Sequence, residues 1–157
     1  MIRQFERGDA LECHKLIQAC LETDTSYSPG LIEKLRNSET PRNITERAGL
    51  FYVAVYESEG RILGLAGLDM NEVRLLYVLP GHQRRGIGRL LLDHLLGMVP
   101  RALFRDVFVY STMQSVDFYR ACGFRDRGPY TFDLQGNSLR TVFMTCPLLP
   151  VAPHKIS

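Results

Sequence analysis

The sequence has no long apolar segment, no run of basic residues and no closely spaced pair of cysteines. A helix that crosses a bilayer needs about 20 mostly apolar residues in a row, and no stretch of this chain approaches that length. The first seven residues show neither an apolar segment nor a small-residue cleavage pattern, so we expect no signal peptide. These absences argue against a membrane protein and predict a cytoplasmic one.

Metal and disulfide chemistry also have little support in the sequence. None of the four cysteines belongs to a Cys-x-x-Cys motif, and all of them have apolar neighbours, which predicts reduced and mostly buried thiols; they are Cys13, Cys20, Cys122 and Cys146. The four histidines lack the spacing of metal ligands. We therefore expect no metal site.

Charge is balanced, with 19 Lys and Arg against 17 Asp and Glu and a net charge of +2. Such a balance favours neither nucleic acid nor a membrane surface as a partner. The 157 residues, of which 45% are hydrophobic, suffice for one domain with its own core. We expect a single domain over residues 1–146 and a C-terminal tail over 147–157, because its prolines cannot continue a sheet.

Hydrophobic periodicity predicts an α+β fold with a mixed, mostly antiparallel central sheet flanked by helices. Helices are expected at 9–22, with Asp9 as the N-cap, and at 29–37, 86–98 and 114–121, whereas residues 38–48 are expected to form a loop. The expected strands are 2–5, 50–56, 61–68, 72–78, 103–110, 130–133 and 139–145. Short turns make the strands 50–56, 61–68 and 72–78 an antiparallel meander, and the helix 86–98 should cross over to a parallel strand.

A glycine-rich turn between the strand 72–78 and the helix 86–98 has the features of an anion site. It includes Gly86 and Gly88, which let the backbone approach a ligand closely. The first N–H groups of a helix have no internal partner, and the helix dipole adds positive charge there. The turn therefore predicts a pyrophosphate site, although a glycine turn that only packs against the sheet stays an alternative. Neither a Walker A motif nor a complete dinucleotide fingerprint is present.

Two motifs resemble those of the GNAT superfamily of N-acetyltransferases. The first is Gln83-Arg84-Arg85-Gly86-Ile87-Gly88, which is similar to the family's Gln/Arg-x-x-Gly-x-Gly/Ala. The second is Phe118-Tyr119-Arg120-Ala121-Cys122-Gly123-Phe124, which is similar to Phe-Tyr-x-x-x-Gly-Phe. They follow one another on the expected elements, and the resemblance extends from Ile2 to about Thr145. It implies a GNAT-like acyl-CoA N-acyltransferase fold and acetyl-CoA as co-substrate.

The resemblance also assigns the residues that bind the cofactor. The pantetheine arm should pair with Leu76-Tyr77-Val78 in a split of the sheet, and the amide of Leu76 should polarise the thioester carbonyl. The pyrophosphate should lie on the amides of residues 84–89, with further charge from Arg84, Arg85 and Arg89. Many relatives carry an asparagine seven residues before the catalytic tyrosine, where this sequence has Thr112, so a hydroxyl would replace only part of that contact.

By the same resemblance, Tyr119 is the general acid that protonates the leaving thiolate; the alternative is an ordinary core tyrosine. Some members use a glutamate eleven residues before the Gln/Arg of the turn as the base, and Glu72 has this spacing to Gln83. A solvent-facing strand residue is an equal alternative for Glu72. Deprotonation through water would make it unnecessary, and Tyr77, Tyr110 and Asp69 are weaker candidates.

Three functions remain open at this point. The first is an N-acetyltransferase in which a small-molecule or protein amine attacks acetyl-CoA directly in a ternary complex. The second is transfer of a larger acyl group, and the third is a noncatalytic acyl-CoA-binding or regulatory domain. The segment 23–48 shows no pattern that names the acceptor, and a homodimer stays open because such domains often form dimers.

Overall fold

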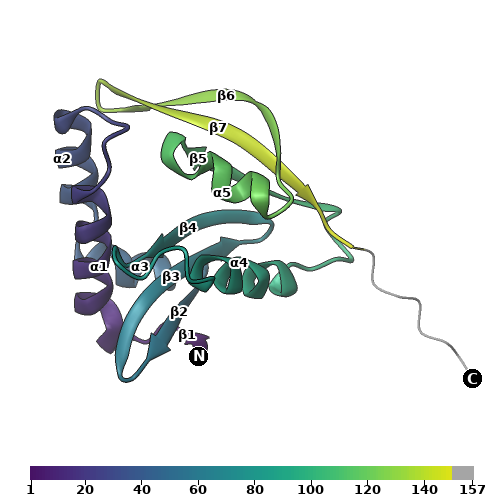
Figure 1. Cartoon of the computed structure of the whole chain (residues 1–157), viewed down its shortest axis with the longest axis horizontal. Coiled ribbons are helices and arrows are strands. Elements are labelled where there is room, and N and C mark those ends of the chain that lie inside the picture. The colour runs from purple at the N-terminus through teal and green to yellow at the C-terminus, as the bar shows by residue number, and fades with distance from the viewer. Residues whose placement is uncertain (150–157) are drawn as a thin grey trace, which may run out of the picture.

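The computed structural model describes residues 1–149 as a seven-stranded sheet with helices on both faces (Figure 1). The strands are β1 (Ile2–Gln4), β2 (Tyr52–Ser58), β3 (Arg61–Asp69), β4 (Glu72–Val78), β5 (Asp106–Thr112), β6 (Arg125–Leu134) and β7 (Asn137–Pro147). The helices are α1 (Ala10–Glu22), α2 (Pro29–Ser38), α3 (Pro41–Ala48), α4 (Ile87–Met98) and α5 (Val116–Ala121). The predicted α+β class is confirmed.

The strand order is β1-β2-β3-β4-β5-β7-β6, and β4 and β5 form the parallel pair. The antiparallel meander of β2, β3 and β4 is as predicted. The α4 crossover between β4 and β5 places these two strands side by side with their carboxyl ends at the same edge. That edge receives the glycine-rich turn, so the topology directs the turn toward the region where β4 and β5 end.

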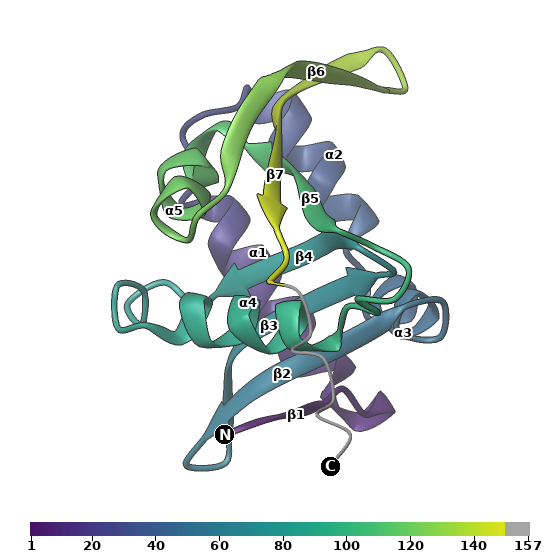
Figure 2. The ribbon, with the colours of Figure 1, turned by 90° about the vertical axis from the view of Figure 1, so that its right-hand side faces the viewer.

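Figure 2 shows α4 on one face of the sheet and α1 on the other, and a hydrophobic core lies on each face. One contains Leu91, Leu92 and Leu95 of α4, which pack on β3 and β5 together with Tyr119 and Phe124. The other contains residues of α1 and α3, which pack on β2 and β3. At Gly64 in β3, an added Cβ would lie 2.8 Å from Leu91 Cδ1, so this glycine lets α4 approach the sheet closely.

The loop predicted for residues 38–48 is wrong, because residues 41–48 form α3. The Thr40 hydroxyl accepts a hydrogen bond from the Asn43 amide at 3.1 Å and caps the helix. Pro41 occupies the first helical turn, where its missing N–H costs no hydrogen bond. Ile44 is 1% exposed and fixes α3 on the second core. Pro41 favours a loop when the sequence is considered alone, but Thr40 and Pro41 together begin a helix here.

Other boundaries shift by a few residues. Asp9 is the N-cap residue of α1, as predicted, but its carboxylate makes no capping hydrogen bond and accepts instead from Arg3 and from the Glu6 amide. β5 begins at Asp106 rather than at 103, and the hairpin of β6 and β7 is longer than predicted. β7 includes Pro147, the first residue of the predicted tail, which pairs with Asp106. Residues 150–157 of that tail lie outside the described residues. Within residues 1–149, no helix has the length and apolar character to cross a membrane.

Candidate active site

The site begins where β4 and β5 separate. Their parallel pairing covers only Glu72 with Phe108 and Val73 with Val109. In the same region β4 has a bulge, because Val73 pairs with Leu68 and Leu75 pairs with Gly67, which leaves Arg74 without a partner on β3. A bulge bends its strand and redirects a side chain. The sheet is therefore open between the second half of β4 and β5.

The open edge of β4 presents backbone groups at Leu76 and Val78. The Leu79 amide donates to the Leu63 carbonyl on β3, and successive residues of a strand point their backbone groups to opposite sides. Tyr77 therefore directs its backbone groups toward β3, whereas Leu76 and Val78 direct theirs toward β5. The Val78 carbonyl accepts from Gln83 Nε2 at 3.0 Å and from Cys20 Sγ at 3.2 Å, which agrees with this direction.

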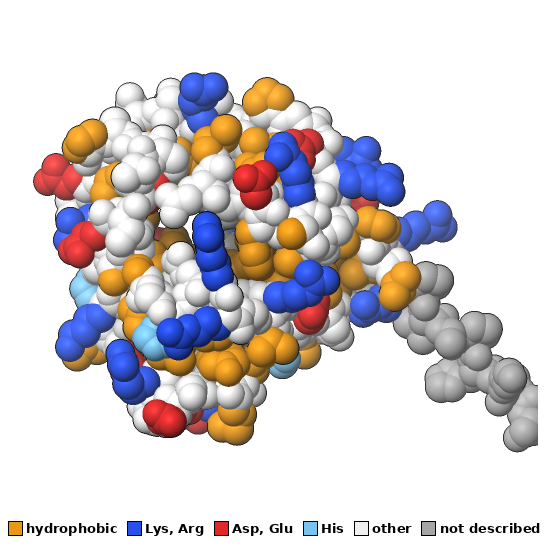
Figure 3. All heavy atoms as spheres, viewed as in Figure 1, with side chains coloured by type: hydrophobic (Ala, Val, Ile, Leu, Met, Phe, Trp, Pro, Cys, Tyr) orange, Lys and Arg blue, Asp and Glu red, His pale blue; other side chains and the backbone are white. Residues whose placement is uncertain are grey.

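Two cavities adjoin this opening. The large cavity has a volume of about 710 Å³, and the small cavity has a volume of about 280 Å³. The large one is bordered by the glycine-rich turn, the start of α4 and α5, whereas the small one is bordered by α1, α2, β4 and β5. They share the lining residues Leu76, Val78, Gln83, Gln114, Ser115 and Tyr119. In the space-filling view, Lys and Arg side chains border a hollow in the surface (Figure 3).

The glycine-rich turn has the backbone geometry that an anion site needs. Gly86 is the N-cap of α4 with φ +85°, and Arg84 also has a positive φ of 61°. A Cβ built on Gly86 would meet no atom within 4 Å, so the backbone there is open to the large cavity. Because the first amides of α4 lack intrahelical acceptors, this turn fits a phosphate group.

The predicted turn residues divide into two groups. Gln83, Arg84, Gly86, Gly88 and Arg89 line the large cavity. Two others are not among the lining residues, because the Ile87 side chain lies in the core and Arg85 is exposed elsewhere. Gly88 also has a packing role, since an added Cβ would lie 3.3 Å from Phe118 Cε2.

Tyr119 lines both cavities although it is only 5% exposed. α5 carries it, and the rings of Phe118 and Phe124 lie against it with centroids 5.2 and 5.3 Å away. Burial raises the pKa of Tyr119 above its ordinary value, and the neighbouring Tyr77 adds to this effect. The hydroxyl is therefore held in its protonated form at neutral pH.

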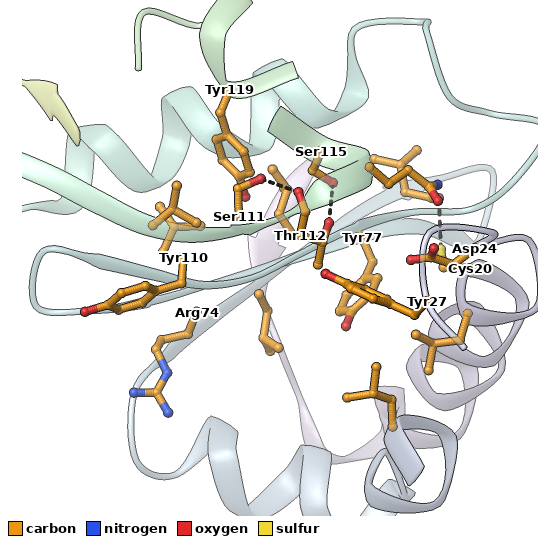
Figure 4. A pocket seen from close by; sticks show the side chains of 18 of the residues that line it. Cys20, Asp24, Tyr27, Arg74, Tyr77, Tyr110, Ser111, Thr112, Ser115 and Tyr119 are labelled. Carbon is orange, nitrogen blue, oxygen red and sulfur yellow. Dashed lines mark hydrogen bonds between the residues drawn. The ribbon is translucent and has the colours of Figure 1, made fainter. Parts of the chain in front are cut away.

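Thr112 and Ser115 lie beside the opening at the end of β5 (Figure 4). Thr112 Oγ1 donates to Ser115 Oγ at 3.1 Å, and Ser115 lines both cavities whereas Thr112 lines the small one. Ser111 donates its hydroxyl proton to the Thr112 carbonyl. Thr112, which the resemblance predicts as a cofactor contact, thus lies at the site, and Ser115 holds its hydroxyl by a hydrogen bond.

The structure places Glu72 at the edge of this region, where it is not among the residues that line either cavity. Its carboxylate lies 3.6 Å from Arg74 Nη1. Burial raises the pKa of Glu72, and the positive charge of Arg74 opposes this shift. Of the weaker candidates, Tyr77 and Tyr110 line the small cavity, and Asp69 lies 3.8 Å from Arg74.

Sequence reasoning missed several residues of the small cavity. Asp24 and Tyr27 come from the connection between α1 and α2, Cys20 from α1, and Arg74 from the bulge. The Tyr27 hydroxyl donates to the Arg140 carbonyl and accepts from the Met113 amide, which fixes this connection to β7. Burial raises the pKa of Cys20 to about 12, so its thiol stays protonated as a donor. No spacing in the sequence indicates that these residues converge.

Among residues 1–149, no group of three His, Cys, Asp or Glu side chains is arranged to hold a metal ion. The four cysteines are free thiols. Of the four, Cys20 lines the small cavity and Cys122 the large one.

Comparison with solved structures finds the same fold in several acetyltransferases. A GCN5-related N-acetyltransferase from Rhodopseudomonas palustris matches with a TM-score of 0.87 and 21% identity over 94% of this chain and 95% of that one. PaiA N-acetyltransferase from Thermoplasma acidophilum, solved with coenzyme A, matches with a TM-score of 0.73 and 17% identity over 94% and 98%. A phosphinothricin acetyltransferase from Sinorhizobium meliloti, solved with acetyl-CoA, matches with a TM-score of 0.69 and 21% identity over 99% and 95%.

A search of curated proteins finds no match. The model of the acetyltransferase (GNAT) domain family, in contrast, matches residues 23–147. This match covers most of the chain, including the glycine-rich turn, the separated strands and Tyr119. The chain therefore belongs to the GNAT acetyltransferase family.

Proposed function

We propose that this protein transfers the acetyl group of acetyl-CoA to a primary amine by direct attack in a ternary complex. The observation that carries the proposal is that the large and small cavities meet across the separation of β4 and β5, with Tyr119 lining both. A reaction between two bound substrates needs such a meeting point, because holding the reactants together lowers the barrier. A cytoplasmic location remains part of this proposal.

The large cavity is the proposed cofactor site. The amides at the start of α4 would hold the pyrophosphate, and Arg84 and Arg89 lie at the same cavity to add positive charge. Arg85 is exposed and would act only on more distant phosphate groups. The Leu76 carbonyl and the Val78 amide face the gap and would pair with the pantetheine amides as an added strand does; the Tyr77 backbone faces β3 and would not take part.

The small cavity is the proposed acceptor site. Its volume of about 280 Å³ suits a small molecule better than a folded protein surface. An amine with a pKa near 10 is protonated at neutral pH and must lose a proton before it attacks. We propose that Glu72 takes this proton through water, because its carboxylate lies next to the cavity-lining Arg74 but is not itself among the lining residues.

Acetyl-CoA supplies an acyl group that is activated as a thioester. A C–N bond forms as the C–S bond breaks, and the Leu76 amide would stabilise the charge on the carbonyl oxygen. Tyr119 would give its phenolic proton to the departing thiolate, and the second proton that the attacking nitrogen loses would restore the phenol. A noncatalytic CoA-binding domain needs no acid at this point, so the placement of Tyr119 between the cavities supports catalysis.

Calorimetry with acetyl-CoA tests this proposal when native protein is compared with Gly86→Glu. The substitution puts a negative side chain at the open N-cap of α4, and we expect binding to be lost. Gly136→Glu is the matched control, because Gly136 has nearly the same φ, +86°, and equal free space, and is absent from both cavity linings. Both variants carry the strain of a left-handed residue, about 1–2 kcal/mol.

Release of free thiol from acetyl-CoA and from longer acyl-CoA substrates, in the presence of small amines, then tests the transfer. We expect turnover with acetyl-CoA in the native protein and in Gly136→Glu. Lack of acetyl-CoA binding by the native protein at millimolar concentration would contradict the proposal. A clear preference for a longer acyl chain would mean that the donor is a longer acyl-CoA, and the proposed cofactor and acceptor sites would still hold.

A further inference from the structure

The small cavity is lined by few charged side chains. Among the described residues that line it, Arg74 is the cation and Asp24 is the anion. They lie at opposite ends of the cavity, with Tyr27 and Tyr77 between them (Figure 4). The Arg74 end also contains Tyr110, so a positive charge and an aromatic ring occur together there.

The guanidinium of Arg74 is only loosely paired. Arg74 Nη1 lies 3.6 Å from Glu72 and 3.8 Å from Asp69, and both distances exceed a hydrogen bond. Two other arginines are paired more closely, since Arg3 lies 2.7 Å from Glu57 and Arg120 lies 2.6 Å from Asp126. Arginine has five N–H donors in a flat fork that matches a carboxylate.

The backbone and a neighbouring ring determine the position of Arg74. The bulge leaves Arg74 unpaired on β3. Its guanidinium carbon lies 5.6 Å from the centroid of the Phe51 ring, within the range of a cation–π contact. The side chain is about half exposed, at 45%, so a ligand can reach the free donors. Arg74 is therefore held in place but keeps unused hydrogen-bonding capacity.

An aromatic cluster continues from the same end of the cavity. Tyr110 lies 5.0–5.9 Å, centroid to centroid, from four other rings. These rings are Phe108, Tyr130, Phe132 and Phe143 of the adjoining strands β5, β6 and β7. None of the five belongs to either hydrophobic core, and Tyr130 is 48% exposed. The cluster offers an apolar surface next to a cation.

We infer that Arg74 binds a carboxylate of the acceptor, and that the preferred acceptors are small amino acids or related amines with an apolar or aromatic body. This inference rests on the proposed function. The carboxylate would accept hydrogen bonds from the free donors of Arg74, and the apolar body would contact Tyr110 and the cluster around it. Arg74 is in this sense a residue that determines specificity and takes no part in the chemical step.

Matched pairs of acceptors test the inference. The pairs are L-phenylalanine with 2-phenylethylamine and L-leucine with 3-methylbutylamine, which differ by the carboxylate. Thiol release from acetyl-CoA gives kcat and KM for each. We expect native protein to favour the amino acid of each pair by about 10–100-fold in kcat/KM, the usual range for a charged hydrogen-bonded contact. The difference should lie mostly in KM, because the contact is also made in the ground state.

Arg74→Gln should remove this preference by raising KM for the amino acids while KM for the plain amines stays the same. Arg74→Lys should restore part of it, because the charge is kept without the fork. Arg61→Gln, which removes an exposed arginine that lines neither cavity, is the control and should keep native kinetics. Thermal unfolding of each variant shows that it is folded.

Three results would overturn the inference while leaving the proposed function intact. The first is equal or better turnover of the plain amines by native protein. The second is thiol release from none of these four acceptors in a protein that binds acetyl-CoA by calorimetry. The third is an Arg74→Gln variant that loses kcat for every acceptor equally and keeps the native preference, which would mean that Arg74 acts through Glu72 or the strand geometry and not on specificity. Absence of acetyl-CoA binding would overturn both the inference and the proposed function together.

Discussion

At the scale of single residues, the position of Tyr119 determines much of the proposed chemistry. Its hydroxyl belongs to a side chain that is 5% exposed and that borders both cavities. Burial disfavours the phenolate, and this raises the pKa of Tyr119. The residue is therefore suited to keep its proton until a strong base such as a thiolate forms beside it.

Tyr119→Phe removes the hydroxyl and keeps the ring that packs against Phe118 and Phe124. We expect kcat to fall by about 10²–10⁴-fold, the usual contribution of a general acid. Acetyl-CoA binding by calorimetry should be unchanged. Because the pKa of Tyr119 is raised, native kcat should show no Tyr119-dependent fall up to pH 9. A kcat equal to that of native protein would remove Tyr119 from the mechanism.

Glu72→Gln tests the proposed base. Glutamine keeps the shape of the side chain and loses its ability to accept a proton, so kcat/KM at pH 7 should fall by about 100-fold. Burial raises the pKa of Glu72, and the acidic limb of the native pH profile should therefore lie above the ordinary glutamate value. The limb should be absent in the variant. An unchanged profile would leave proton removal to bulk water.

Sequence motifs identify residues of this site only where a family pattern exists. Gly86 and Tyr119 stand in such patterns, and the structure places both at the large cavity. Arg74, Asp24 and Tyr27 have no motif, because they converge only through the bulge and through the packing of the α1–α2 connection on β7. The role of Glu72 depended on spacing alone, and spacing does not report the distance of a side chain from a cavity.

At the scale of elements, α3 is a helix whose first residues resemble a loop in the sequence. Residues 40–48 contain few apolar residues, and Ile44 is the buried one. The helix depends on its cap and on one fully buried side chain in the second core, with Ala48 packed against that core at the end of the helix. The helix therefore forms because Thr40 and Pro41 favour a helix start and because Ile44 packs into the core. Eight residues are too few for a hydrophobic periodicity that would predict this packing from the sequence.

Thr40→Ala should destabilise the protein by about 1 kcal/mol, because the Asn43 amide loses its acceptor. Urea unfolding followed by circular dichroism measures this change. Thr40→Ser keeps the hydroxyl oxygen and is the control, with an expected loss of only a few tenths of a kcal/mol. Equal stability of the alanine and serine variants would show that the cap contributes nothing measurable to α3.

At the scale of the whole molecule, an ion-pair cluster joins β1 to β2 and to the residues just before α1. Arg3 lies 2.8 Å from Asp9 and 2.7 Å from Glu57. Hydrogen bonds from Arg3 lower the pKa of Asp9 below its ordinary value, and burial opposes them in part. A carboxyl with a depressed pKa stabilises the fold above its unfolded pKa, and this stability is lost as the pH falls through the folded value.

Thermal unfolding between pH 7 and pH 2 tests this linkage. At pH 7, Asp9→Asn should be less stable than native protein by about 1–3 kcal/mol, because Arg3 loses a charged partner. The difference should shrink below about pH 4, where Asp9 of the unfolded chain begins to take up a proton, and should be lost as the pH falls through the lower pKa of Asp9 in the folded protein. Asp93→Asn alters an exposed aspartate of α4 and serves as the control. A difference that stays constant down to pH 2 would contradict the linkage.

The sequence by itself determined the α+β class, the antiparallel meander, the crossover to a parallel strand and the glycine-rich turn. These features follow from local periodicity, turn residues and short connections, which act over a few residues. Only the tertiary structure decided where β4 and β5 separate, that two cavities meet there, and that Arg74 and an aromatic cluster border the smaller one. Those features arise from contacts between strands and helices that are distant in the chain, and no local pattern encodes them.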